Sequence, residues 1–270
     1  MSGHDLSRIQ VGIIGGGHLG RALARALPGA GIRPDNIHIS FAGNPQTLRE
    51  LEKAGLSGNI AENTAICDKS DLIFLAIRPQ SLLSLRGLAL QRAALVVSCM
   101  AGIPCHLVEE TLCRPVVRMM PSGPETLTGH NGIVAVYPAS PLLEVILAGI
   151  GQEVCSLPEE SVMDIFTAGV CLPAVLIFLR FHNRDADTEI RPVIREYPLM
   201  EQLYAWGTAA VPSDIAPEEG HTYIVRMSTK GGITEAIIAS LARGEPLETA
   251  FRAGVARCAA LRDGAGCRDP

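Results

Sequence analysis

The stretch VGIIGGGHLGRALARAL, Val11 to Leu27, decides the fold of the first half of this chain. It begins as a short apolar run, typical of a buried parallel strand, and continues with apolar residues at helical spacing. Between the two lies a G-x-G-x-x-G pattern formed by Gly15, Gly17 and Gly20. In a strand–turn–helix, these glycines let the backbone approach a pyrophosphate at the positive end of the helix. The stretch therefore predicts a dinucleotide-binding βαβ unit, with a tight turn that holds no ligand as the alternative.

Strand-like and helix-like segments alternate through the first half. Apolar runs typical of buried strands also occupy residues 36–40, 71–77, 94–100, 115–121 and 132–138. Helices are predicted at residues 18–27, 44–55 and 105–112, the second of them capped by Asn44 with Pro45 in its first turn. This alternation predicts an α/β protein whose residues 1–158 form a Rossmann-type domain, with a parallel sheet and helices on both faces.

The strand pattern stops after Pro158, and residues 159–270 are predicted to form an all-helical C-terminal domain. Its helices are expected at residues 161–169, 172–181, 199–211, 232–242 and 247–262. Residues 180–198 are unusually polar for this region. Within them, His182 is a candidate pocket residue, and we expect solvent around most of the four arginines, Arg180, Arg184, Arg191 and Arg195.

The end of the second predicted strand indicates which dinucleotide binds. An NAD site usually has Asp or Glu there, which binds both ribose hydroxyls and would repel a 2′-phosphate. Here Ser40, Gly43 and Asn44 are neutral, and the next acid is Glu50. The sequence therefore favours NADP(H) over NAD(H). Ser40 and Asn44 are predicted to bind the cofactor, together with His18 and Leu19 of the glycine-rich segment.

Composition narrows the classes of partner. The chain has 270 residues, of which 47% are hydrophobic and 19% charged, with a formal net charge of −5 and no basic cluster. Nucleic acid and anionic membranes are therefore not expected partners. No apolar run reaches the roughly 18 residues of a membrane span, and the first ten residues lack a signal core, which predicts a cytoplasmic protein. The eight scattered cysteines are expected to be mostly buried thiols, and no metal site is predicted.

Five segments together resemble a known family. VGIIGGGHLG, DLIFLAIRPQ, VVSCMAGIP, VVRMMPSGP and STKGGITEAII occur in this order. The chain is similar to the pyrroline-5-carboxylate reductases, the enzymes that make proline, from about Val11 to Leu261. The resemblance implies NADPH-dependent reduction of the cyclic imine 1-pyrroline-5-carboxylate to L-proline. It also implies that the helical domain joins two subunits in a homodimer or higher homo-oligomer.

The resemblance assigns further residues. It places the residues after the third, fourth and fifth strands along the cofactor, namely Ala76, Ile77, Arg78, Pro79, Ala101, Gly102 and Ser122. It assigns the substrate to the start of a helix, at Thr229, Gly231, Gly232, Ile233 and Thr234. The paired glycines there expose backbone N–H groups suited to a carboxylate. Thr234 matches the hydroxyl that reaches the imine nitrogen. A simple capping turn is the alternative.

Three departures from the family pattern leave alternatives open. Ser122 replaces an asparagine, and only Pro173 and Ala174 remain of a glycine-rich turn at residues 169–174. Lys230 replaces a proline. It is a second catalytic candidate beside Thr234, since a cation there could hold another carboxylate or protonate a carbonyl oxygen; a solvated lysine is the other interpretation. The chain could thus reduce a different imino, oxo or hydroxy acid, or bind NADP(H) without turnover as a regulatory protein. The retention of Thr234 argues against the last of these.

Overall fold

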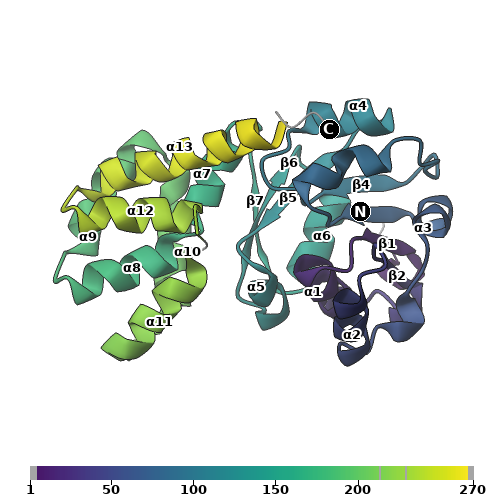
Figure 1. The fold of residues 1–270 in the computed structure, drawn as a ribbon, viewed down its shortest axis with the longest axis horizontal. Coiled ribbons are helices and arrows are strands. Elements are labelled where there is room, and N and C mark those ends of the chain that lie inside the picture. The colour runs from purple at the N-terminus through teal and green to yellow at the C-terminus, as the bar shows by residue number, and fades with distance from the viewer. Residues whose placement is uncertain (1–4, 213, 229, 267–270) are drawn as a thin grey trace. The chain divides into compact units, whose positions relative to one another are not determined.

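The computed structural model describes residues 5–212, 214–228 and 230–266, with side chains described as far as Leu261. The chain divides into two compact units, the first ending at Glu160 and the second beginning at Ser161. Strands occur in the first unit, whereas the described part of the second is helical (Figure 1).

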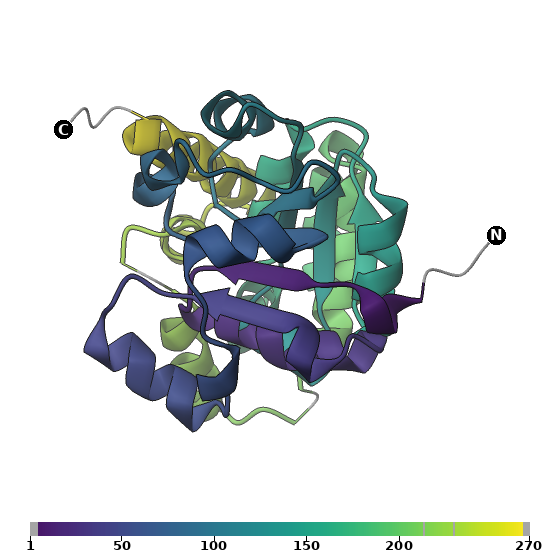
Figure 2. The ribbon, with the colours of Figure 1, turned by 90° about the vertical axis from the view of Figure 1, so that its right-hand side faces the viewer.

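The first unit is built on a seven-stranded sheet with strand order β2-β1-β3-β4-β5-β6-β7. The strands are β1 (Val11–Ile14), β2 (Ile37–Ser40), β3 (Leu72–Leu75), β4 (Leu95–Ser98), β5 (Val117–Pro121), β6 (Ile133–Tyr137) and β7 (Glu153–Ser156). All six strands that the sequence predicts are present. Every residue of β1 and β3 is buried, because the sheet is covered on both faces. Figure 2 shows β1 and β2 side by side.

The sheet is mixed, so the prediction of a parallel sheet is wrong at one position. β6 runs antiparallel to β5, and β7 then pairs parallel with β6. The connection from β5 to β6 is residues 122–132 only, and a parallel crossover needs a dozen residues or more. β7 is not predicted from the sequence because Glu153 and Ser156 are exposed, which leaves no apolar run.

Six α-helices accompany the sheet in the described part of this unit. They are α1 (His18–Ala26), α2 (Pro45–Lys53), α3 (Asn63–Lys69), α4 (Cys105–Leu112), α5 (Pro124–Gly129) and α6 (Pro141–Gly149). The predicted cap of α2 is confirmed, since the Asn44 side chain accepts hydrogen bonds from the N–H groups of Gln46 and Thr47 at 2.8 and 3.3 Å. The short helices α3, α5 and α6 are not predicted from the sequence.

The described part of the second unit contains seven helices. They are α7 (Val162–Gly169), α8 (Leu172–Phe181), α9 (Ala186–Glu196), α10 (Leu199–Ala210), α11 (Pro217–Met227), α12 (Ile233–Ala242) and α13 (Leu247–Gly266). α8 is its central helix, buried at every position from Leu172 to Leu179. In the described ranges no single helix has the length and apolar composition of a membrane span; α7 and α8 meet that test only as a pair, bent by 45°.

Helices α9 and α11 are absent from the sequence prediction. α9 contains Pro192 and many charges, yet it buries Ile190 and Val193 against its own unit. Arg180, Arg191 and Arg195 are exposed as expected. Arg184 is half-buried instead, where it pairs with Glu189 and donates to the carbonyl oxygen of Glu245.

Candidate functional site

The three glycines of the first turn have distinct environments. Gly15 has a φ of +117°, and a Cβ added to it would lie 2.5 Å from the carbonyl oxygen of Ala76. A Cβ on Gly20 would lie 1.9 Å from the carbonyl oxygen of Gly15. A Cβ on Gly17, in contrast, would meet no atom within 4 Å. Gly15 and Gly20 are thus required by packing, whereas Gly17 borders open space.

That open space lies at the start of α1, where Gly17 is the N-cap residue. The first N–H groups of a helix have no acceptor within the helix, and the helix dipole is positive there. The turn is held in place by backbone hydrogen bonds, from Gly15 N to the carbonyl oxygen of Ser40 and from Ala76 N to that of Ile14. These residues stand at the carboxyl ends of three parallel strands, the usual place for a dinucleotide in this architecture. The geometry fits a pyrophosphate.

The other residues assigned to the cofactor follow neighbouring strand ends. Ala76 to Pro79 come directly after β3, and the Ile77 side chain lies 3.1 Å from the Cβ position of Gly15. Ala101 and Gly102 follow β4; Ala101 is exposed, and Gly102 has a φ of +72°. Strand order therefore brings the segments after β1, β2, β3 and β4 to the same edge of the sheet.

The end of β2 contains no acidic side chain. Ser40 is only 5% exposed, and its carbonyl oxygen accepts the hydrogen bond from Gly15. Gly43 has a φ of +76°, and a Cβ there would meet nothing within 4 Å. The exposed Asn44 uses its side-chain oxygen to cap α2, which leaves the NH₂ group of its amide as a donor.

Two residues of the first unit differ from what the sequence suggests. The hydroxyl oxygen of Ser122 accepts from the N–H of Ile133 at 3.2 Å and lies 2.8 Å from the hydroxyl of Thr126. Ser122 therefore also holds α5 to β6. Arg21 is not predicted from the sequence as a site residue, yet its guanidinium donates to the carbonyl oxygen of Gly16 at 2.9 Å. It adds a positive charge beside the glycine turn.

A second group of assigned residues lies at the start of α12. Gly232 is the N-cap, and Gly231 has a φ of +70°, a conformation that favours glycine. Gly231 donates its N–H to Oε2 of Glu235 at 2.6 Å, and its carbonyl oxygen accepts from Nε of Arg257 at 2.6 Å. Lys230 is exposed. Thr229 lies outside the described residues.

Thr234 meets the connection between α7 and α8. Its side chain is buried at 8% exposure, and its hydroxyl donates to Sγ of Cys171 at 3.2 Å. Burial raises the pKa of the Cys171 thiol to about 11, and the hydrogen bond from Thr234 offsets part of that rise. The thiol is thus protonated at neutral pH. The fold brings Thr234 next to the turn at residues 169–174, where the chain departs from the family pattern.

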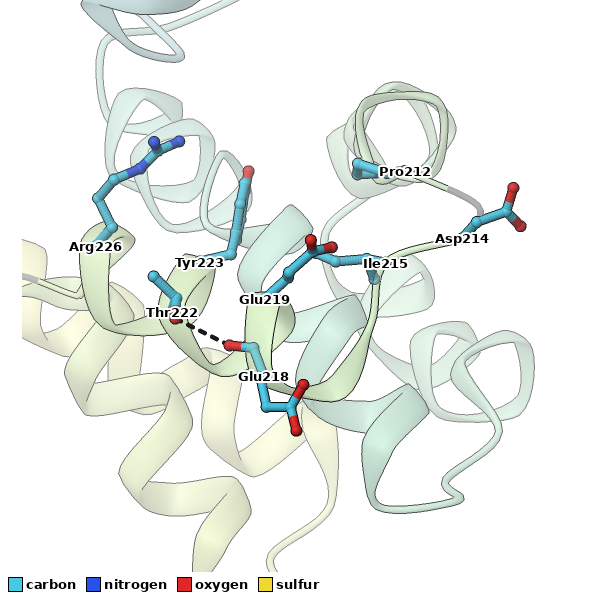
Figure 3. Close-up of a pocket in the computed structure, with 8 residues that line it drawn as sticks. All are labelled: Pro212, Asp214, Ile215, Glu218, Glu219, Thr222, Tyr223 and Arg226. Atoms are coloured by element: carbon cyan, nitrogen blue, oxygen red, sulfur yellow. Dashed lines mark hydrogen bonds between the residues drawn. The ribbon is translucent and has the colours of Figure 1, made fainter.

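Cavities in the second unit lie elsewhere. A cavity of about 640 Å³ beside α11 is lined by the eight residues drawn in Figure 3, including Asp214, Glu218 and Glu219. The residues assigned from the sequence are not among them. A second cavity, of about 580 Å³, is lined mainly by apolar residues of α8, α11 and α12. His182 and Glu235 also line it, so His182 is a pocket residue, stacked on Phe178 at 3.9 Å.

No metal site is predicted from the sequence, and the described residues of both units can be compared with that expectation. Among the residues that the structure describes, no group of three or more His, Cys, Asp or Glu side chains could hold a metal ion. Five of the seven described cysteines are buried: Cys67, Cys99, Cys105, Cys155 and Cys258.

Comparison with known proteins shows similarity to pyrroline-5-carboxylate reductases. Residues 10–102 match a family model described as "NADP oxidoreductase coenzyme F420-dependent". The pyrroline-5-carboxylate reductase of Pseudomonas aeruginosa is 29% identical over 249 residues, covering 87% of this chain and 89% of that protein. The enzyme of the same name from Methanosarcina acetivorans is 35% identical over 171 residues, covering 58% and 62%. The chain is thus similar to pyrroline-5-carboxylate reductases, in the case of the Pseudomonas aeruginosa enzyme over most of its length.

The pyrroline-5-carboxylate reductases are NAD(P)-dependent oxidoreductases. Similarity to some of them is partial, because the chain spans about half the length of two further curated pyrroline-5-carboxylate reductases that it matches, 45% and 53%. The fold agrees over nearly the whole chain. The structure of the pyrroline-5-carboxylate reductase of Coxiella burnetii has a TM-score of 0.59 at 21% identity, covering 95% of this chain and 98% of that one.

Proposed function

We propose that this chain belongs to the pyrroline-5-carboxylate reductase family and transfers a hydride from NADPH to a cyclic imine, reducing 1-pyrroline-5-carboxylate to L-proline. The hydride goes to the carbon of the C=N bond, and the nitrogen takes up a proton. The observation that carries the proposal is the glycine turn. The Cβ positions of Gly15 and Gly20 are occupied by neighbouring atoms, whereas that of Gly17 borders open space at the positive end of α1.

NADPH would supply the hydride, and residues of the first unit would bind NADPH. The N–H groups at the start of α1 bind the pyrophosphate, with Arg21 nearby as a countercharge. The neutral end of β2 accepts a 2′-phosphate, since no carboxylate repels it. The amide of Asn44 and the loop around Gly43 are the donors available there.

Thr234 is the residue that we assign to the imine nitrogen. Its hydroxyl donates to the sulfur of Cys171 in the structure, and a thiol sulfur is a weak acceptor. Rotation of the hydroxyl toward a ring nitrogen therefore loses little. A donor at that nitrogen stabilises it as electrons arrive during hydride transfer. The N–H groups of Gly231 and Gly232 are the proposed partners of the substrate carboxylate.

One observation favours a second candidate function. Lys230 is exposed, and within the described ranges it has no acidic partner at ion-pair distance. A free cation beside the substrate turn could hold a second carboxylate on a larger imino, oxo or hydroxy acid. A protein that binds NADP(H) without turnover is the remaining alternative, which the retained Thr234 disfavours.

We also propose that two copies associate through the helical unit. Val225 and Met227 of α11 are apolar side chains exposed by 59% and 36%, close to a cavity with a mostly apolar lining. Burial of such a surface favours association. Light scattering after size exclusion measures the mass, and a monomer at micromolar concentration contradicts this part of the proposal. A cytoplasmic location remains a prediction, supported by the described cysteines, which form no disulfide with one another.

The test of the main proposal is NADPH oxidation followed by absorbance. The substrates are 1-pyrroline-5-carboxylate and a panel of imino, oxo and dicarboxylic acids. Turnover of 1-pyrroline-5-carboxylate with the highest kcat/KM supports the proposal. A better dicarboxylic substrate selects the second candidate. Tight NADPH binding with no turnover of any substrate selects the regulatory alternative.

A further inference from the structure

The turn before α12 is fixed by hydrogen bonds to both backbone polar atoms of Gly231. Gly231 has both backbone polar atoms engaged, its N–H by the carboxylate of Glu235 and its carbonyl oxygen by the guanidinium of Arg257, each at 2.6 Å. A Cβ on Gly231 would lie 3.3 Å from Nη2 of Arg257. The positive φ and these two contacts fix the direction in which the N–H points.

Glu235 therefore occupies a place suited to an external carboxylate. It is the third residue of α12, where a negative charge is favoured by the helix dipole and can reach back to the turn. Its side chain is exposed and is held there by a backbone donor rather than by burial. Such a contact can exchange with a ligand.

The positive charges near Gly231 favour binding of one carboxylate at its N–H, but a second carboxylate cannot bind there at the same time. Lys230 and Arg257 both lie at Gly231, and in the described part of the chain neither forms an ion pair. One N–H cannot serve two carboxylates, and two carboxylates in contact repel each other. Glu235 already lines the cavity of about 580 Å³ together with His182 and His221, so space for its side chain exists away from the N–H.

We infer that Glu235 is a specificity-determining residue, a carboxylate of the chain itself that competes with the substrate carboxylate for the N–H of Gly231. The inference rests on the proposed function, in which this N–H binds the substrate. A cyclic imine with a carboxylate must displace Glu235, whereas one without a carboxylate need not. Glu235 thus weakens binding of carboxylated imines and leaves the chemical step unchanged.

Steady-state kinetics at saturating NADPH test this inference, with 1-pyrroline-5-carboxylate and with 1-pyrroline, which has the same ring without the carboxylate. Glu235→Gln removes the charge but keeps an oxygen that can accept from Gly231. It should lower KM for 1-pyrroline-5-carboxylate by about five- to tenfold with kcat unchanged. KM for 1-pyrroline should stay constant or rise. Glu248→Gln is the matched control, a first-turn acid of α13 paired with Arg252, and should alter neither KM.

A purely structural role for Glu235 would produce another result. Equal changes for both substrates, or a higher KM for the carboxylated imine in Glu235→Gln, would overturn the inference while leaving the proposed reductase function intact. Thermal unfolding of each variant establishes that it folds.

A second measurement does not depend on turnover. Calorimetric titration with L-proline, in the presence of NADP⁺, measures affinity for the carboxylated ring directly, with pyrrolidine as the ligand that lacks the carboxylate. Glu235→Gln should bind L-proline about five- to tenfold more tightly than the unchanged protein does. Equal affinity in both proteins, or no binding in either, overturns the inference. Absence of NADPH oxidation with both imines contradicts the proposed function alone.

Discussion

Gly17→Val separates cofactor binding from folding. A Cβ at Gly17 would meet no protein atom within 4 Å, and the residue has a φ of −68°, which any residue adopts. The substitution replaces a favourable helix N-cap with an unfavourable one, which costs about 1 kcal/mol of unfolding free energy. The new side chain occupies the space assigned to the pyrophosphate. We expect NADPH affinity to fall by at least about 100-fold, or roughly 2.7 kcal/mol.

Two further glycines provide the comparison. A Cβ at Gly20 would lie 1.9 Å from a backbone oxygen that cannot move aside alone, so Gly20→Ala should destabilise the first unit by about 3 kcal/mol. Gly58 also borders open space but lies away from the turn, so Gly58→Val should leave NADPH affinity unchanged. Urea unfolding and fluorescence titration with NADPH measure the two quantities. The reasoning is refuted if Gly17→Val binds NADPH as tightly as the unchanged protein, or loses as much stability as Gly20→Ala.

The remaining predictions concern the substrate turn, the choice of dinucleotide and the buried thiol. Thr234→Ala should lower kcat by about 100-fold with NADPH affinity unchanged, while Thr234→Ser should retain most activity. Equal kcat in all three proteins would show that the Thr234 hydroxyl has no role in hydride transfer. NADPH should bind at least about tenfold more tightly than NADH, and Ser40→Asp should narrow the difference; equal affinities in the unchanged protein would contradict the argument from the end of β2. Lys230→Pro should lower kcat/KM for dicarboxylic substrates by about tenfold while kcat/KM for 1-pyrroline-5-carboxylate holds or rises, and an equal effect on both would place Lys230 in solvent. Burial raises the pKa of Cys171 from 9.0 to about 11, so the folded state holds this proton more tightly than the unfolded state. Its contribution to stability is complete below pH 9 and should be lost as the pH rises from 9 to 11, and Cys171→Ala should reduce that loss in urea unfolding measured at each pH.

Local patterns were sufficient for the glycine turn and for six strands. A strand covered on both faces must be apolar throughout, so β1 and β3 are evident as apolar runs. A Cβ on Gly20 would meet the carbonyl oxygen of Gly15, only five residues earlier, so the spacing of the pattern itself specifies this contact. Gly15 is also constrained from a distant segment, because its Cβ would meet Ala76 directly after β3. The cap of α2 likewise depends on Asn44 and the next three residues.

Elements without such patterns depend on partners far along the chain. β7 has exposed polar ends and forms because β6 offers it an edge. The direction of β6 follows from the length of its connection to β5, not from the residues within the strand. α9 is stabilised by burial of Ile190 and Val193 and by the Arg184–Glu189 pair, despite its proline and its charges.

The sequence by itself located the turn before α12, because Gly231 and Gly232 stand directly before a predicted helix. Its role in substrate binding stays a proposal. Only the tertiary structure decided what the residues there contact. Thr234 meets Cys171 from 63 residues earlier in the chain, and Arg257 reaches Gly231 from 26 residues later. Glu235 lies only four residues from Gly231, yet its contact requires the positive φ of that glycine. The hydrogen bond from Arg257 to the carbonyl oxygen of Gly231 fixes the direction of the N–H. Hydrogen bonds of this kind depend on the positions and directions of atoms in segments far apart along the chain. The local sequence of one segment does not specify which distant segment folding will place beside it.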